Sequence, residues 1–116
     1  MLRELIATPS VSRDECAAAD IMEHRIKGYG FDCHRRGNNV WAVAPDYDPA
    51  RPTILLNAHI DTVKPVSSWT RDPFSPDIVD GRLYGLGSND CGGGLCSLLQ
   101  TFRWASTVRR SYNLVY

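Results

Sequence analysis

Two segments of the chain space their apolar residues as an amphipathic α-helix does. The first follows Ser12 and ends at Gly28 or Gly30, with apolar residues on one stripe at Ala18, Ile21, Met22 and Ile26. The second runs from Gly92 to about Val108 and turns inward Leu95, Leu98, Leu99, Phe102 and Ala105. Ser12 and Glu15 have the spacing of a capping box, so we expect their side chains to bond the backbone at the start of the first helix.

The other apolar segments are short and predict strands. They are residues 31–36, 40–44, 53–58, 78–84 and 112–116. Turn residues at Gly37–Asn39 and at Asp80–Gly81 indicate two hairpins. Thr53–Ala58 is almost continuously apolar, a pattern typical of a strand buried on both faces. With a short helix over Met1–Ala7, this order of elements predicts an α/β fold, a mixed and largely parallel sheet flanked by helices.

Composition indicates one globular unit and excludes several classes of partner. The chain has 116 residues, is 43% hydrophobic and carries thirteen basic and thirteen acidic residues. A net charge of zero gives no basic surface for nucleic acid or for an anionic membrane. The N-terminus lacks the apolar core of a signal peptide and no stretch approaches membrane-spanning length, so we expect a cytoplasmic protein. The four cysteines form no CxxC pair and are predicted to be free thiols.

The candidate chemistry begins where the apolar segment 53–58 ends. His59 and Asp61 are two residues apart, so a strand conformation would direct both side chains to the same face. A histidine so placed is a candidate metal ligand, and the neighbouring acid can hold its ring in one tautomer. Asp61 could also be a turn acid at the strand end. His24 and His34 have no such partner, and we assign them no role.

A second acid, Asp90, lies in a glycine-rich turn between Gly87 and Gly92. By itself it could cap the following helix, and that role is compatible with a carboxylate that bridges two metal ions. A dinucleotide-binding loop is the rival interpretation of Gly85 and Gly87. We reject it because an acid that would repel pyrophosphate replaces the third glycine, and because a hairpin precedes the turn.

These residues resemble a known family in combination. Leu55–Val63, Pro73–Phe74 and Asp80–Asp90 are similar to motifs of the M20 family of metallopeptidases and deacylases, and the likeness begins at Leu5. The turn Gly85–Asp90 resembles the acetylornithine deacetylase-like members. The residue after Asp90 departs from the pattern, since the family more usually has a lysine before the glycine and this chain has a cysteine.

The resemblance implies a zinc-dependent hydrolase that cleaves the amide bond of an N-acyl amino acid, with a role in amino-acid or arginine biosynthesis. His59 would be a ligand of one zinc ion, Asp90 would bridge two ions, and Asp61 would be the active-site acid that orients His59. Cobalt could replace zinc. The partners implied are a small-molecule substrate and a second copy of the intact protein, with no nucleic acid and no membrane.

We expect residues 1–116 to be the N-terminal part of the catalytic metallohydrolase domain, without a lid or dimerisation domain. In the family, a strand like Tyr112–Tyr116 leads into a pair of glutamates that supply the general base and a further ligand. Two ligands are too few for four-coordinate zinc, so we expect the 116-residue chain to be inactive by itself. The alternative is a non-catalytic remnant that serves as a binding or assembly module.

Overall fold

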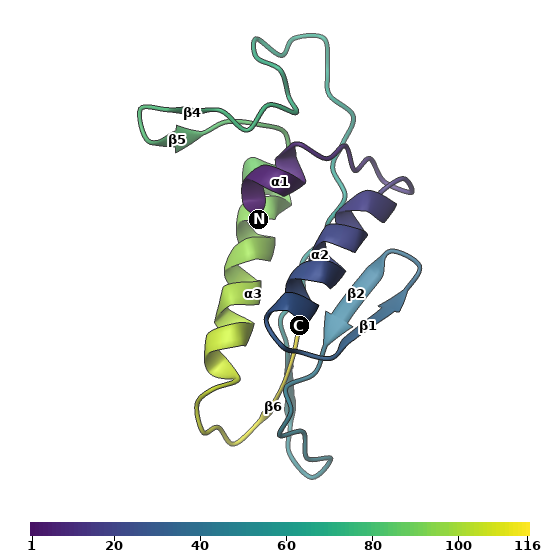
Figure 1. Cartoon of the computed structure of the whole chain (residues 1–116), viewed down its shortest axis with the longest axis vertical. Helices are drawn as coiled ribbons and strands as arrows, with labels where there is room; N and C mark the ends of the chain where they lie inside the picture. Colours follow the sequence, from purple (N-terminus) through teal and green to yellow (C-terminus); the bar gives the residue numbers. More distant parts are fainter.

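Three α-helices, six short strands and one irregular helical turn make up the fold (Figure 1). The computed structural model describes all residues, 1–116. The elements in chain order are α1 (Leu2–Ile6), α2 (Cys16–Gly28), β1 (Cys33–Arg36), β2 (Asn39–Ala42), β3 (Thr53–Leu55), β4 (Ile78–Val79), β5 (Arg82–Leu83), the irregular turn η1 (Ser88–Gly93), α3 (Gly94–Ala105) and β6 (Asn113–Val115). The predicted helices and strands are present, with most strands shorter than expected.

The last strand, β6, joins the other strands near the C-terminus. It pairs with β3 in parallel, Ile54 opposite Leu114. On its other side the backbone of Tyr116 exchanges two hydrogen bonds with Ala42, at 2.9 and 3.0 Å. Since β2 pairs antiparallel with β1, the strands follow the spatial order β1, β2, β6, β3. The β4–β5 hairpin stands apart, as Figure 1 shows. The predicted α/β class with mixed pairing is confirmed.

The core lies where α2 and α3 meet β2 and β6. Its buried residues are Met22, Ile26, Ala42, Ala44, Leu95, Leu99, Phe102, Ala105, Leu114 and Tyr116. Phe102 is fully buried, and its ring centre lies 4.9 Å from that of Phe31 and 6.1 Å from that of Tyr116. The helical stripes predicted from the sequence therefore face inward, although Ile21 is only partly buried.

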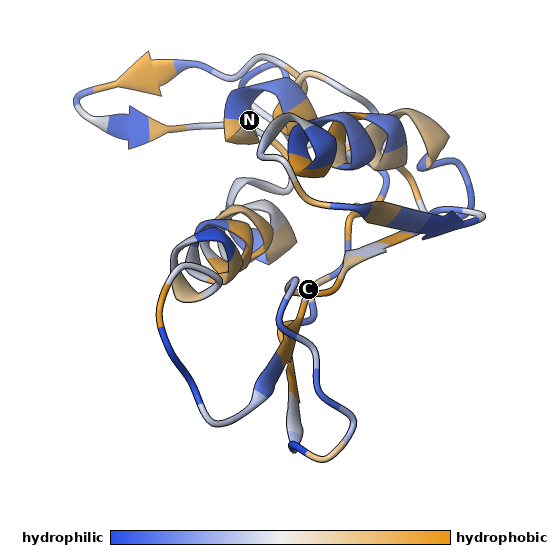
Figure 2. Ribbon diagram, turned by 60° about the horizontal axis from the view of Figure 1, so that its bottom comes forward, coloured by the Kyte–Doolittle hydropathy of each residue, from blue (hydrophilic) through white to orange (hydrophobic).

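The prediction that 53–58 is a strand buried on both faces is wrong. Ile54 is 43% exposed and Leu55 62% exposed. The strand has one sheet neighbour, β6, and neither long helix packs extensively against it. Figure 2 shows β3 and β6 as apolar ribbons beside the C-terminus, in contrast with the hydrophilic β1. The apolar pattern fits a central strand, but within this chain β3 lies at the edge of the sheet.

The predicted capping box is also wrong. Helix α2 begins at Cys16 after Glu15, and no side chain caps its first turn. The Ser12 hydroxyl instead donates to the carboxylate of Asp61. An ionised acceptor makes a stronger hydrogen bond than a neutral backbone group, which explains why the hydroxyl turns away from the helix.

None of the helices combines the length and the apolar composition needed to cross a membrane.

Replacing Phe102 tests the position of the core. We expect Phe102→Ala to lower the free energy of unfolding by about 3–5 kcal/mol, because it leaves a cavity between two aromatic rings. Urea denaturation followed by circular dichroism measures the change. Trp104→Ala is the matched control on the outer face of the same helix, where the side chain is 66% exposed, and it should cost about 0.5 kcal/mol or less. Equal losses in the two variants would contradict this core.

Candidate metal centre

The candidate site forms where three loops meet near the N-terminal end of α3. His59 and Asp61 follow β3, Asp90 lies in η1 before α3, and Ser12 precedes α2. The backbone holds two of these loops together. The amide of Thr62 donates to the carbonyl of Ser10 at 2.8 Å, next to a parallel bridge between Val11 and Thr62. Residues from distant parts of the sequence are thereby fixed around His59.

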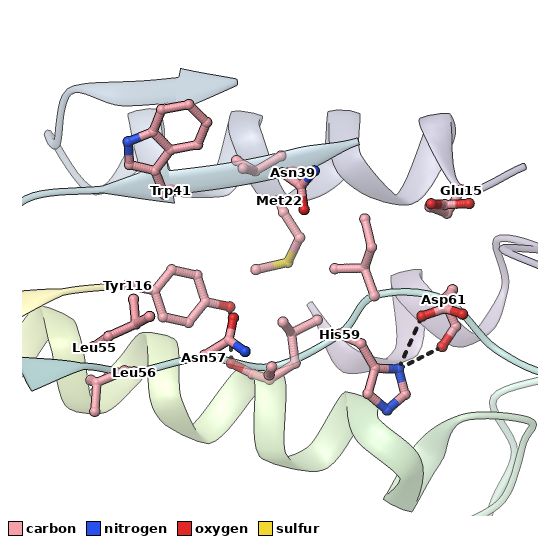
Figure 3. Close-up of a pocket in the computed structure, with 14 residues that line it drawn as sticks. Glu15, Met22, Asn39, Trp41, Leu55, Leu56, Asn57, His59, Asp61 and Tyr116 are labelled. Carbon is pink, nitrogen blue, oxygen red and sulfur yellow. Dashed lines mark hydrogen bonds and ion pairs between the residues drawn. The ribbon is translucent and has the colours of Figure 1, made fainter. Parts of the chain in front are cut away.

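The His59 ring links the three residues that the sequence singled out. Its Nδ1 atom lies 2.9 Å from the backbone carbonyl oxygen of Asp61 and 3.2 Å from Oδ1 of the same residue (Figure 3). Its Nε2 atom lies 3.0 Å from Oδ1 of Asp90. Asp61 therefore holds one side of the ring, and the other side faces Asp90. This is the arrangement expected of a histidine ligand with an acid that orients it.

Two carboxylates, those of Asp61 and Asp90, contact the imidazole ring of His59. Burial alone would lower the pKa of His59, but hydrogen bonds and negative charge from Asp61 and Asp90 raise it overall. The pKa of Asp61 is lowered, first by the Ser12 hydroxyl, and also by the nearby His59, although burial opposes the shift. These contacts therefore stabilise the protonated form of the ring and the ionised form of Asp61.

The turn that carries Asp90 is tightly packed. Gly87 has a φ of +75°, a left-handed conformation that favours glycine. A Cβ atom on Gly92 would lie 2.6 Å from the carbonyl oxygen of Gly87 and 2.7 Å from a methyl carbon of Leu2. Asp90 itself has extended backbone angles within the turn, and its side chain caps no helix. Its carboxylate is 91% exposed and contacts Nε2 of His59 through Oδ1. The suggestion that Asp90 caps α3 is wrong.

The arrangement of donor atoms around His59 shows how far the site fits a metal ion. Nε2 of His59 and Oδ1 of Asp90 are both common zinc donors and approach each other. Asp61 lies on the opposite side of the ring, so no group of three or more His, Cys, Asp or Glu side chains is arranged around one point. The chain therefore offers two convergent donors, which fit part of a zinc coordination shell but do not complete it.

No other histidine or cysteine forms a metal-binding group with these residues. His34 stacks on Trp41 with ring centres 5.5 Å apart. All four cysteines are free, as predicted. Ser12 is the residue that the sequence argument missed at the site. Its spacing to Glu15 is that of a capping box, so the local pattern contained no sign of its contact with Asp61.

His59 lies between two cavities of about 260 Å³ each. One is lined by residues 39–41 of β2 and by residues 55–61, and Figure 3 shows it lying between these segments, with Glu15 and Asp61 at one end. Along this cavity the backbone N–H and C=O of Ala58 make no hydrogen bond. The other cavity is lined by Trp69 and by residues 85–90, so it borders both candidate ligands.

Comparison with known proteins identifies the family. Residues 55–115 match the model of peptidase family M20/M25/M40. The chain belongs to this family. Two relatives are succinyl-diaminopimelate desuccinylases. That of Stenotrophomonas maltophilia (strain K279a) is 39% identical over 102 residues, which are 83% of this chain and 26% of the relative. That of Phenylobacterium zucineum (strain HLK1) is 39% identical over 92 residues, 76% of this chain and 24% of the relative.

Two solved structures share the fold. An M20 family metallo-carboxypeptidase from Sulfolobus solfataricus superposes with a TM-score of 0.75 at 22% identity, covering 98% of this chain and 28% of the other. Human carnosine dipeptidase 1 gives a TM-score of 0.70 at 20% identity, covering 98% and 29%. The M20 chain thus spans about a quarter of the length of the relatives it matches.

The packing of Gly92 gives a test of how the M20 chain places Asp90. We expect Gly92→Ala to displace the turn, because the added methyl group would collide with backbone. The free energy of unfolding should fall by about 1–3 kcal/mol. The ring signals of His59 should shift in the NMR spectrum as Asp90 moves away. Gly28→Ala is the control, since its Cβ would meet no atom within 4 Å, and it should leave both measurements close to wild type.

Proposed function

We propose that this chain supplies part of the ligand set of the catalytic metal centre in an M20-type amidohydrolase. In this proposal residues 1–116 belong to the catalytic domain, His59 and Asp90 bind divalent metal, and Asp61 orients His59. The observation that carries the proposal is the approach of His59 Nε2 to Asp90 Oδ1 at 3.0 Å, with Nδ1 of the same ring held by Asp61. Family membership supports hydrolysis of an amide bond with a divalent metal.

Asp61 and Asp90 have different roles in this proposal. Asp61 accepts a hydrogen bond from the N–H at Nδ1, so the lone pair of Nε2 is available for a metal ion. Asp90 would hold divalent metal through its exposed carboxylate, and zinc suits this mixed set of nitrogen and oxygen donors. A divalent metal supplies Lewis-acid polarisation of a carbonyl oxygen and activation of water. The cavity beside Trp69 borders both ligands and is where we place the scissile amide.

The substrate we propose is an N-acylated amino acid. The relatives named above are succinyl-diaminopimelate desuccinylases, and this name describes removal of an acyl group from an amino acid. They favour a desuccinylase-like substrate over the acetylornithine that the turn motif alone indicated. A homodimer of the intact enzyme remains part of the proposal.

A second function, as a binding or assembly module, has one observation in its favour. The chain brings together only two metal donors at one point, fewer than a catalytic zinc site uses. A module of this kind would keep its fold and its partner after both donors are removed. The metal titration below tests the first function alone, because the module does not need His59 or Asp90.

Removing either donor tests the metal site. We expect Zn²⁺ or Co²⁺ added to the wild-type chain to bind weakly and to shift the ring signals of His59, since two donors converge there. His59→Ala and Asp90→Ala should each abolish binding, as followed by NMR titration. His34→Ala removes a histidine that stacks on Trp41 instead and should bind metal as wild type does. Unchanged binding in His59→Ala would disprove the site.

Truncating Asp61 tests its role as the orienting acid. We expect Asp61→Ala to weaken metal binding by about tenfold, at the lower end of the usual range for such partners, because the Asp61 carbonyl still faces Nδ1. Asp32→Ala removes an exposed acid elsewhere and serves as the control. Complete loss of binding in Asp61→Ala would instead show that Asp61 is itself a ligand.

A further inference from the structure

Ser12 reaches the site from a separate part of the chain. Its hydroxyl donates to Oδ2 of Asp61, across 49 positions of sequence. The other carboxylate oxygen, Oδ1, lies 3.2 Å from Nδ1 of His59. The two oxygens of Asp61 therefore face different partners, the serine on one side and the histidine on the other. Ser12, Asp61, His59 and Asp90 form one continuous chain of polar contacts.

The position of Ser12 is set by the backbone and not by the hydroxyl itself. The bridge between Val11 and Thr62 joins the serine loop to the loop that carries Asp61. The Ser10 carbonyl accepts the Thr62 amide at 2.8 Å, and the Asp14 amide closes a turn onto the Val11 carbonyl at 2.7 Å. The hydroxyl is thus presented to Asp61 by hydrogen bonds on both sides of it.

A carboxylate in this place needs such a partner to keep its orientation. The Asp61 side chain is 36% exposed, and the torsion of a terminal carboxylate has a broad energy profile. Without a fixed donor on Oδ2, the group can rotate and present its oxygens to water. The acceptor facing Nδ1 of His59 would then be only the backbone carbonyl of Asp61, 2.9 Å away.

We propose that Ser12 is a positioning residue that sets the tautomer and the orientation of His59 through Asp61. Two acceptors compete for the ring proton, Asp61 at Nδ1 and Asp90 at Nε2. Ser12 holds Oδ1 of Asp61 beside Nδ1, where it adds a second acceptor to the Asp61 backbone carbonyl and favours the Nδ1–H tautomer of the neutral ring. In that tautomer the lone pair of Nε2 points to the side of Asp90. The value of this arrangement for catalysis rests on the metal-binding function proposed above, but the effect on the ring does not.

The test measures the ring of His59 directly in the metal-free chain. Long-range ¹H–¹⁵N NMR spectra, recorded at a pH at which the ring is neutral, report the ratio of the Nδ1–H to the Nε2–H tautomer. We expect this ratio to fall about two- to tenfold in Ser12→Ala, the range that the loss of one hydrogen bond produces. Ser12→Thr keeps a hydroxyl and should restore the wild-type ratio.

A matched control separates positioning from simple loss of stability. Ser10→Ala removes a buried hydroxyl from the same loop that is not a hydrogen-bond partner of Asp61 or His59, and it should leave the ratio unchanged. A ratio in Ser12→Ala equal to that of wild type, or a failure of Ser12→Thr to restore it, would overturn the proposal. Zinc titration of the same variants distinguishes the two proposals. If the ratio shifts but no variant binds zinc, Ser12 positions the ring and the metal-binding function is wrong.

Discussion

The pairing of β6 with two strands is the constraint on which the rest of the structure depends. Its backbone bonds β2 on one side and β3 on the other, and Leu114 and Tyr116 fill the core between α2 and α3. The side-chain amide of Asn113 also donates to the carbonyls of Asp48 and Arg51, which fastens the loop before β3. Because β6 fixes the direction of β3, it also fixes the point at which the chain leaves the sheet and presents His59.

Local patterns in the sequence were sufficient to predict the helices, the hairpins and the contact between His59 and Asp61. The apolar stripe of α3 and the turn at Asp80–Gly81 appear where periodicity and turn chemistry place them. The contact between His59 and Asp61 was also predicted, from the side-chain period of a strand, and it is present although both residues lie beyond the end of β3. The approach of Asp90 to His59 had to be inferred from two motifs together, and the structure brings the residues to 3.0 Å.

The predictions that failed concern contacts between distant segments. Whether β3 is buried depends on which elements lie beside it, and its own residues do not determine that. The target of the Ser12 hydroxyl lies on another loop, so a pattern four residues long was a poor guide to it. Both errors arose from treating a local signal as if it fixed a tertiary contact. Local propensity predicts which elements form much better than it predicts what they touch.

The unbonded backbone of Ala58, beside the exposed Leu55, affects how the chain behaves in solution. An apolar segment whose N–H and C=O groups face an open space is a template for pairing with any other extended polypeptide. Residues 53–58 contain no proline and no charged side chain, so two of the usual safeguards against such pairing are missing from this segment. At high concentration, copies of this chain should therefore associate edge to edge through this segment. A charged side chain in place of Leu55 would oppose this association.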